Sequence, residues 1–170
     1  MTACVRLDGW YVLAASPASV RHARRYVWEV LVGLGAAHVV ADAELLVSEL
    51  VTNAIRHVQG PPDGVVRVVL YQRGSSLRIE VHDADLRCPI IGRPAGDSES
   101  GRGLWVVAHV AAAWGWDHTA TGKSVWAELP AVWAAAPGAD VAADTVENAT
   151  MRGPSGASAG SSGPAQVQGV

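Results

Sequence analysis

Three residues with chemically capable side chains recur every four positions in one stretch of the chain. Glu49, Asn53 and His57 have this spacing in SELVTNAIRH, together with the apolar Leu46 and Leu50. In an α-helix this spacing places them on one face. A carboxylate and an amide oxygen one turn apart suit a hard cation such as Mg²⁺, which also keeps waters and substrate phosphates as ligands. The alternative is a surface helix whose polar residues are simply solvated.

A second candidate is an acid at the end of a β-strand. In LRIEVHDA, alternation puts Leu77, Ile79 and Val81 on one face, and Asp83 falls on the same inward face. A carboxylate on an inward face needs a reason. The alternative is an ordinary turn-forming aspartate.

A glycine-containing turn comes directly before an apolar helix. In Gly101-Arg102-Gly103-Leu104, the free backbone N–H groups and the helix dipole could bind phosphate. The turn lacks the preceding strand and the third glycine of a dinucleotide-binding fingerprint, which excludes that interpretation. The alternative is a hinge that ends a loop.

A second glycine motif, Gly122-Lys123-Ser124, resembles the end of a P-loop. We exclude a P-loop because Asp117 stands where its first glycine is required, and because a strand follows where a helix is needed. Lys123 is the only lysine of the chain, so any mechanism that needs a lysine depends on it.

Composition excludes several broad classes of function. The 170 residues, 49% hydrophobic and 17% charged, suffice for one globular domain with a core. A net charge of −3 with scattered basic residues argues against direct binding to nucleic acid or to an anionic membrane. Cys4 and Cys88 form neither a CxxC motif nor a Cys/His cluster, and no signal or transmembrane segment is visible, so we expect a cytoplasmic protein.

The candidate residues require a particular set of elements to position them. Periodicity predicts a helix in SVRHARRYVWEVLVGLG, ended by Gly33 and Gly35, a second helix over about 40–58, and a third that starts in ESGRGLWVV. Strands are predicted at residues 10–14, in VVRVVLYQ and LRIEVHDA, and in WGWDH and KSVWAELP. The order strand, helix, helix, hairpin, helix, hairpin predicts an α/β (α+β) fold, a two-layer sandwich with a mixed, mostly antiparallel sheet.

The chain divides into three parts on composition. We expect residues 1–14 to hold an N-terminal segment and the first strand, and residues 15–136 to form the domain. The tail at 137–170 is rich in Ala, Gly, Ser and Pro, so we expect it to be disordered.

Taken in order, these motifs resemble those of a known superfamily. SELVTNAIRH, a strand ending in VHDA, a long loop, SGRGLWVVAHVAAAWGW and GKSVWAEL are similar to the GHKL (Bergerat-fold, histidine kinase-like) ATPases, which include histidine kinases and type II topoisomerases. The chain most resembles the stand-alone anti-sigma factor serine/threonine kinases of actinobacterial type. The resemblance covers about residues 15–129 and implies ATP and Mg²⁺ as cofactors.

Within the resemblance, Glu49 matches the general base and Asn53 matches the magnesium ligand. Asp83 matches the aspartate that accepts a hydrogen bond from the adenine amino group. This fits the chemistry, because guanine carries a keto group there and would leave the carboxylate unpaired.

Four consecutive residues, Gly101, Arg102, Gly103 and Leu104, match the segment that closes over the phosphates, with residues 84–100 as a lid. Ser124 lies where the family often has a threonine or serine near the adenine.

One part of the family pattern is altered. The family's aspartate box is D-x-G-x-G, whereas this chain reads Asp83-Ala84-Asp85, and Leu86-Arg87-Cys88-Pro89 lacks the second glycine. Asp85 brings a side chain and a negative charge where glycine would let the backbone approach the nucleotide. We therefore expect a weakened affinity for ATP.

The resemblance implies an ATP-binding regulatory protein. It would bind a sigma factor or another transcription regulator, phosphorylate a small antagonist protein, and contact neither nucleic acid nor membrane directly; a homodimer is left open. A basic strip on the first helix, Arg21, Arg24 and Arg25, could meet an acidic partner, or be only a solvated face. The alternative function is a catalytically inactive GHKL-fold binding module that acts through protein–protein interaction alone.

Overall fold

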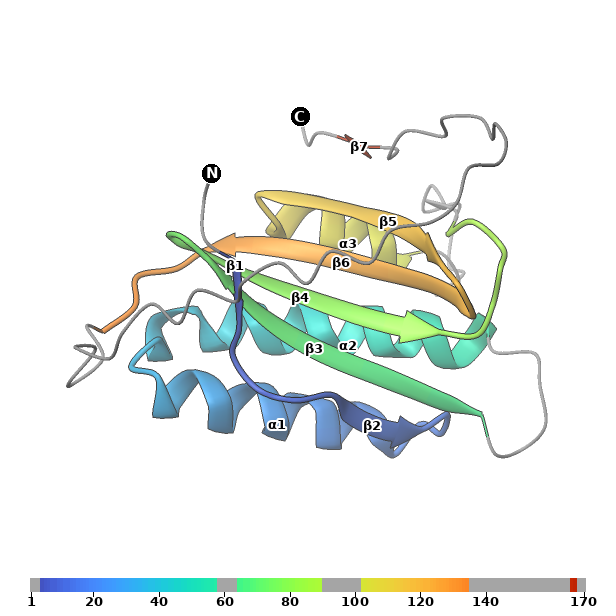
Figure 1. The fold of residues 1–170 in the computed structure, drawn as a ribbon, viewed down its shortest axis with the longest axis horizontal. Helices are drawn as coiled ribbons and strands as arrows, with labels where there is room; N and C mark the ends of the chain where they lie inside the picture. Colours follow the sequence, from blue (N-terminus) through green and yellow to red (C-terminus); the bar gives the residue numbers. More distant parts are fainter. Residues whose placement is uncertain (1–3, 58–63, 90–101, 135–165, 168–170) are drawn as a thin grey trace, which may run out of the picture.

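The computed structural model describes residues 4–57, 64–89, 102–134 and 166–167 (Figure 1). Its elements, in chain order, are β1 (Cys4–Arg6), β2 (Tyr11–Ala14), α1 (Ser19–Gly33), the short 3₁₀ helix η1 (Ala37–Val39), α2 (Val40–His57), β3 (Val65–Arg73), β4 (Ser76–Asp83), α3 (Arg102–Val110), β5 (Ala113–Thr119), β6 (Gly122–Pro130) and β7 (Gln166–Val167).

One sheet organises the molecule. Its strand order is β1-β3-β4-β6-β5-β7, and β2 pairs with β3 as well. Every strand pairing among the described residues is antiparallel. In Figure 1 the three α-helices lie on one side of this sheet, with α1 and α2 next to each other. The predicted two-layer, mostly antiparallel fold is confirmed.

The core lies between the sheet and the helices. It is built from residues at helical spacing on α2 and at alternate positions on the strands. Fully or almost fully buried members are Leu46, Val47, Leu50 and Ala54 of α2, Leu77, Ile79 and Val81 of β4, and Val125, Ala127 and Leu129 of β6. The inward face predicted for β4 is therefore confirmed, and β6 presents the same period-two pattern.

Local interactions define both ends of α1. The buried Ser19 hydroxyl donates to the carbonyl of Ala14 over 2.7 Å, which ties the helix start to the end of β2. At the other end Gly35 has a φ of 71°, and the N–H of Ala36 donates to the carbonyl of Leu31 over 2.8 Å. This is the Schellman arrangement, in which glycine reverses the chain at little steric cost. The predicted stop at Gly35 is confirmed.

The sheet face opposite the helices carries charged residues. Arg78 forms ion pairs with Glu80 and Glu128, at 2.6 and 3.3 Å, and its guanidinium lies 3.9 Å from the ring centroid of Trp126. The indole N–H of Trp126 donates to Asp117 over 3.0 Å. This face is therefore held by a polar network and not by a second apolar core.

Two short strands that were not predicted lie toward the two ends of the chain. Residues 1–14 hold β1 as well as the predicted strand, and β1 pairs with the end of β3. Most of the predicted disordered tail lies outside the described residues, but Gln166 and Val167 form β7 against Gly115 and Trp114 of β5. An edge strand such as β5 offers unpaired N–H and C=O groups to any extended segment.

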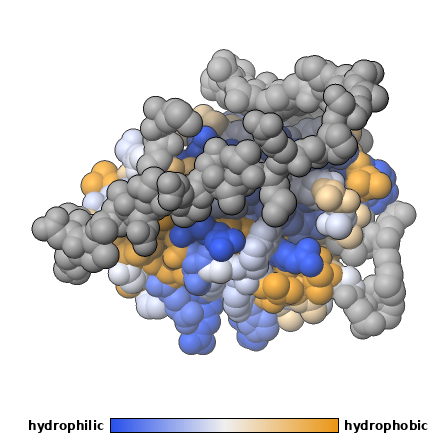
Figure 2. Space-filling view, in the orientation of Figure 1, coloured by the Kyte–Doolittle hydropathy of each residue, from blue (hydrophilic) through white to orange (hydrophobic). Residues whose placement is uncertain are grey.

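None of the described helices is both long enough and apolar enough to cross a bilayer. Figure 2 shows hydrophilic residues gathered over α1, along the lower edge of the view.

Candidate functional site

The first predicted site residues stand on α2. Glu49 and Asn53 are half-buried, one turn apart, while Leu46 and Leu50 on the same stretch are fully buried in the core. The side-chain nitrogen Nδ2 of Asn53 is buried and has no hydrogen-bond partner among the described residues. His57 is the last residue of α2, and its side chain lies outside what the structure describes. An orphaned buried amide next to a carboxylate is an incomplete polar site.

The start of α3 lies against the Glu49 carboxylate. A Cβ added at Gly103 would come within 2.8 Å of Glu49 Oε2, so only glycine fits here without moving the carboxylate. The structure thus brings Glu49 together with the first turn of α3. In this turn Arg102 is exposed and the Leu104 side chain is buried in the core, so Leu104 could bind a ligand only through its backbone. Gly101 lies outside the described residues.

The third predicted site residue, Asp83, is buried at the end of β4. Its two carboxylate oxygens differ. Oδ1 accepts hydrogen bonds from Lys123 Nζ and from the backbone N–H of Asp85, both at 2.8 Å. Oδ2 is buried and has no partner among the described residues. A buried acceptor of this kind costs free energy unless a ligand or water satisfies it.

The partner of Asp83, Lys123, is a site residue that sequence reasoning missed. Its side chain is only 1% exposed, although lysine is almost never fully buried unless it is paired. Asp83 and Lys123 face each other in the register of β4 and β6. The signal was available in KSVWAEL, because Lys123 is in phase with the buried Val125 and Ala127.

Close backbone packing supports this pairing. A Cβ at Gly122 would overlap the carbonyl oxygen of Asp83 and come within 2.7 Å of the Cα of Ala84. Glycine at this position therefore lets β6 approach the end of β4 closely. The Gly-Lys-Ser sequence that resembles a P-loop has this structural role.

The charge of Asp85 is compensated within the chain. Its carboxylate pairs with Lys123 at 3.2 Å and with Arg87 at 2.9 Å. Burial acts to raise the pKa of Asp85, but the hydrogen bonds from Arg87 and the interaction with Lys123 outweigh it and hold the pKa well below its usual range. The sequence predicted the negative charge of Asp85 but did not reveal the two cations that pair with it.

Ser124 is buried but is separated from the Asp83 side chain. It pairs in register with His82, so strand alternation puts Ser124 on the sheet face opposite to that of Asp83 and Lys123. The structure therefore does not bring the Ser124 side chain to the Asp83 carboxylate, and its expected place near the adenine stays a prediction. Lys123, one residue earlier, has that position.

A cavity of about 580 Å³ opens on the other side of the Asp83 backbone. Trp10, Arg67 and His82 contribute to its lining, and the rings of Trp10 and His82 meet edge to face with centroids 4.9 Å apart. The cavity reaches Asp83 and Ala84, but it lies on the face of His82, away from α2. It therefore does not include Glu49 or Asn53.

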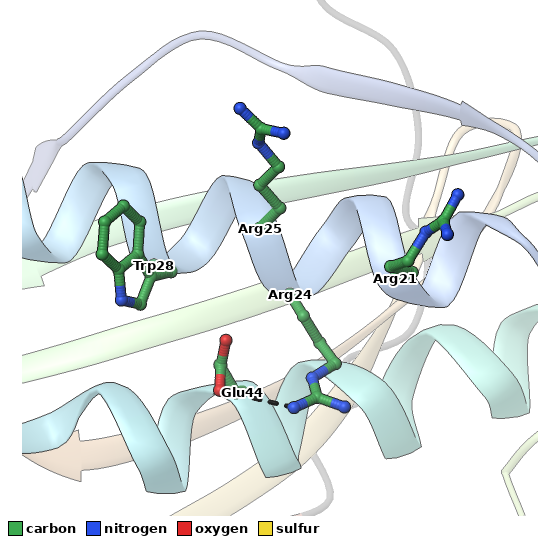
Figure 3. A pocket seen from close by; sticks show the side chains of 5 residues that line it. All are labelled: Arg21, Arg24, Arg25, Trp28 and Glu44. Atoms are coloured by element: carbon green, nitrogen blue, oxygen red, sulfur yellow. Dashed lines mark ion pairs between the residues drawn. The ribbon is translucent and has the colours of Figure 1, made fainter.

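A second, shallower hollow of about 420 Å³ lies between α1 and α2 (Figure 3). It is lined by the predicted basic strip, Arg21, Arg24 and Arg25, together with Trp28 and Glu44. Figure 3 shows Arg24 reaching from α1 toward Glu44, at 3.5 Å, while Arg25 points away from α2. The basic strip thus lines an exposed hollow that also contains one acidic residue, Glu44.

The chemistry of the donor set limits how a metal ion could be held. Within the ranges that the structure describes, no group of three or more His, Cys, Asp or Glu side chains is arranged to bind a metal. A half-turn of the Asn53 amide exchanges its nitrogen and oxygen, so the same buried position can present an oxygen. Such a site fits Mg²⁺ held by one protein ligand, waters and phosphates, and not a structural metal.

Comparison with known proteins agrees with the fold and with the order of the motifs. Residues 13–129 match the family described as histidine kinase-like ATPase domain. A comparison with curated proteins found no significant match. The matched segment runs from β2 to β6 and includes α2, the end of β4 and α3, which carry the candidate site. Since it also spans well over half of the 170 residues, the chain belongs to the histidine kinase-like ATPase domain family of the GHKL superfamily.

Proposed function

We propose that the chain binds ATP with Mg²⁺ between α2, the end of β4 and the start of α3, and acts as a regulatory serine/threonine kinase of the anti-sigma type. The observation that carries the proposal is the buried Asp83 Oδ2, an acceptor without a partner among the described residues. It belongs to the residue that the family resemblance assigns to the adenine amino group. An N–H of the base would satisfy it.

The other residues support the same assignment. The Asn53 amide, also without a partner for its Nδ2 among the described residues, would turn its oxygen to a magnesium ion, which would neutralise charge on the phosphates. The backbone N–H groups and the dipole at the start of α3 suit phosphate oxygens. ATP would supply the phosphoryl group, and the chain would orient it.

Glu49 would act as the general base. Its carboxylate would accept the proton of a target serine or threonine hydroxyl as that oxygen bonds to the γ-phosphorus and ADP leaves. The close approach of Glu49 to Gly103 supports this role, because it puts the carboxylate beside the turn that suits the phosphates. A Cβ added at Gly103 would come within 2.8 Å of Oε2. We infer that the phosphoacceptor is a small antagonist protein and that a sigma factor or another transcription regulator is the bound partner.

A non-catalytic binding module is the second candidate. It is favoured by the altered aspartate box, where Asp85 and Arg87 replace glycines and are ion-paired to each other. That pairing removes the flexibility that two glycines would give the segment after β4. In this case the fold would regulate by binding its partner without phosphoryl transfer.

Titration calorimetry with ATP and Mg²⁺ tests the nucleotide site. We expect binding in the micromolar range or weaker, and we expect Asp83→Asn to weaken it about ten- to hundredfold by removing the charged acceptor. Arg67→Gln, a change on the opposite sheet face, is the control and should bind like the wild type. Absence of heat and of competition at millimolar ATP would leave the non-catalytic module as the function.

A further inference from the structure

The ammonium group of Lys123 is held by groups of the protein itself. Nζ donates to Asp83 Oδ1 over 2.8 Å and to the backbone carbonyl of Asp85 over 3.3 Å, and it forms an ion pair with Asp85 Oδ2 at 3.2 Å. The side chain is 1% exposed, so its charge is compensated by these acceptors and not by water. We therefore look for its role in the groups that it holds.

Asp83 is held asymmetrically as a result. Oδ1 accepts from Lys123 and from the N–H of Asp85, whereas Oδ2 is buried without a partner among the described residues. Both donors approach the same oxygen, so the carboxylate is hydrogen-bonded through Oδ1 and unpaired at the buried Oδ2. A ligand would therefore find one available acceptor on Asp83, Oδ2, and not both carboxylate oxygens.

We propose that Lys123 is a positioning residue for base recognition, an inference that rests on the proposed function. Lys123 engages Oδ1 and thereby presents Oδ2 of Asp83 as a single acceptor for the 6-amino group of adenine. The amino group donates along one N–H to one oxygen, which matches this geometry.

The same contact explains how the altered aspartate box can remain compatible with a ligand. Asp85 replaces a glycine of the family pattern and carries a charge, but Lys123 and Arg87 pair with that charge. Without Lys123, two carboxylates would stand close together in a largely buried place with no cation between them. Asp85, the departure from the family pattern, and Lys123 thus compensate for each other's charge.

The test compares ATP with purine riboside 5′-triphosphate, which lacks only the 6-amino group. In the wild type we expect ATP to bind about ten- to hundredfold more tightly, the range for one hydrogen bond to a charged group. In Lys123→Met we expect this ratio to fall to within about threefold of unity, because Asp83 Oδ1 keeps only the backbone N–H of Asp85 and the carboxylate loses its charged partner. The ratio reports on the amino group, so a general loss of stability does not change it.

Two further variants control for folding. Arg78→Met removes another largely buried cation from β4, on the opposite sheet face, and should keep the wild-type ratio. The second control is the double variant Lys123→Met/Asp85→Asn. It removes one negative charge together with the ammonium, so we expect it to be more stable to unfolding than Lys123→Met alone. Circular dichroism and melting identify the folded variants, and we expect the ratio to be lost in both.

The outcomes separate this inference from the proposed function. If a folded variant without Lys123 keeps the wild-type ratio, or if the wild type binds both nucleotides equally, Lys123 does not position Asp83 for the base, although the nucleotide site itself stands. If the wild type binds neither nucleotide, the proposed function fails and the inference fails with it.

Discussion

Glu49 and Asn53 lie one turn apart on α2 but are expected to act on different parts of the reaction. Glu49→Ala should leave binding of ATP and Mg²⁺ within a few-fold and lower phosphoryl transfer by about 10²–10⁴, because a general base contacts the attacking hydroxyl. Asn53→Ala should weaken nucleotide binding itself, because it removes a ligand of the bridging ion. Calorimetry and transfer of radiolabelled phosphate to candidate antagonist proteins measure the two effects.

The control for this pair is Ser48→Ala on the same helix. The Ser48 hydroxyl donates to the carbonyl of Glu44 within α2, over 2.6 Å, so its loss should change neither measurement. If Glu49→Ala silences the target regulator in cells as well as the wild type does, and neither protein transfers phosphate, the kinase assignment is wrong and sequestration is the function.

At the residue scale, the sequence identified the acid and missed its cation. Asp83 could be predicted because period-two alternation places it in phase with apolar neighbours in its own strand. Lys123 could be noticed as the only lysine, but its contact depends on the register between β4 and β6, which are 40 residues apart at this pair. Local patterns do not specify a register between distant strands.

At the element scale, the packing of β5 on β6 depends on Gly115, which leaves room for the ring of Trp126 on the paired strand. A Cβ at Gly115 would come within 2.6 Å of Trp126 Cζ2, a ring atom that cannot turn aside as a flexible side chain does. Gly115→Ala should therefore lower the free energy of unfolding by about 1–3 kcal/mol, and disturb the stacking of Arg78 on the ring. Urea denaturation measures this.

Gly33→Ala is the matched control for that change. Nothing lies within 4 Å of a Cβ at Gly33, which ends α1, so alanine should be neutral or slightly stabilising there. Equal effects of the two substitutions would contradict the role given to Gly115.

The outer face of the sheet should make stability depend on pH through Glu80. Burial acts to raise its pKa, but the hydrogen bond from His82 and the charge of Arg78 outweigh this, so the pKa is lowered from its usual value of 4.5. A lowered folded-state pKa contributes stability that is present above the unfolded value and is lost as the pH falls through the folded value. Glu80→Gln should therefore be less stable than the wild type at neutral pH.

The difference between these two proteins should shrink as the pH falls below about 4.5, where the unfolded carboxylate takes up its proton. Unfolding free energies measured across the acid range check this. A difference that is constant with pH would mean that Glu80 acts through packing and not through its charge.

The main elements could be predicted because each carries its own periodic pattern. The helices and strands that contain apolar residues at helical or alternating spacing, such as α2 and β4, agree with prediction to within a few residues. The strands β1 and β7 were missed because they have three and two residues, respectively. A strand that short has no period to detect and exists only through its neighbour, β3 or β5.

At the scale of the whole molecule, the basic strip on α1 is expected to guide association with an acidic partner. Arg24 pairs with Glu44, and Arg25 with Glu29 at 2.7 Å, whereas Arg21 forms no ion pair with another described residue. Arg21→Glu should slow association and make it less sensitive to salt, with little effect on ATP binding, because charges at a rim mainly act on the association rate.

The matched control is Arg67→Glu, a charge reversal of the same size on β3. Association rates with candidate sigma factors and antagonist proteins, measured at low and high salt, compare the two variants. Equal rates for both would mean that the strip only keeps the protein soluble.

The ion pair between Asp83 and Lys123 also bears on the order in which the molecule folds. The two residues are 40 positions apart, and α3 and β5 lie between them in the chain. A segment this long must be closed into a loop before the pair can form, which is entropically slow compared with helix or hairpin formation. The β3–β4 hairpin can therefore form early with Asp83 still exposed to water. The cation reaches the acid only when β6 pairs with β4, so we expect the ion pair at the proposed site to form late in folding.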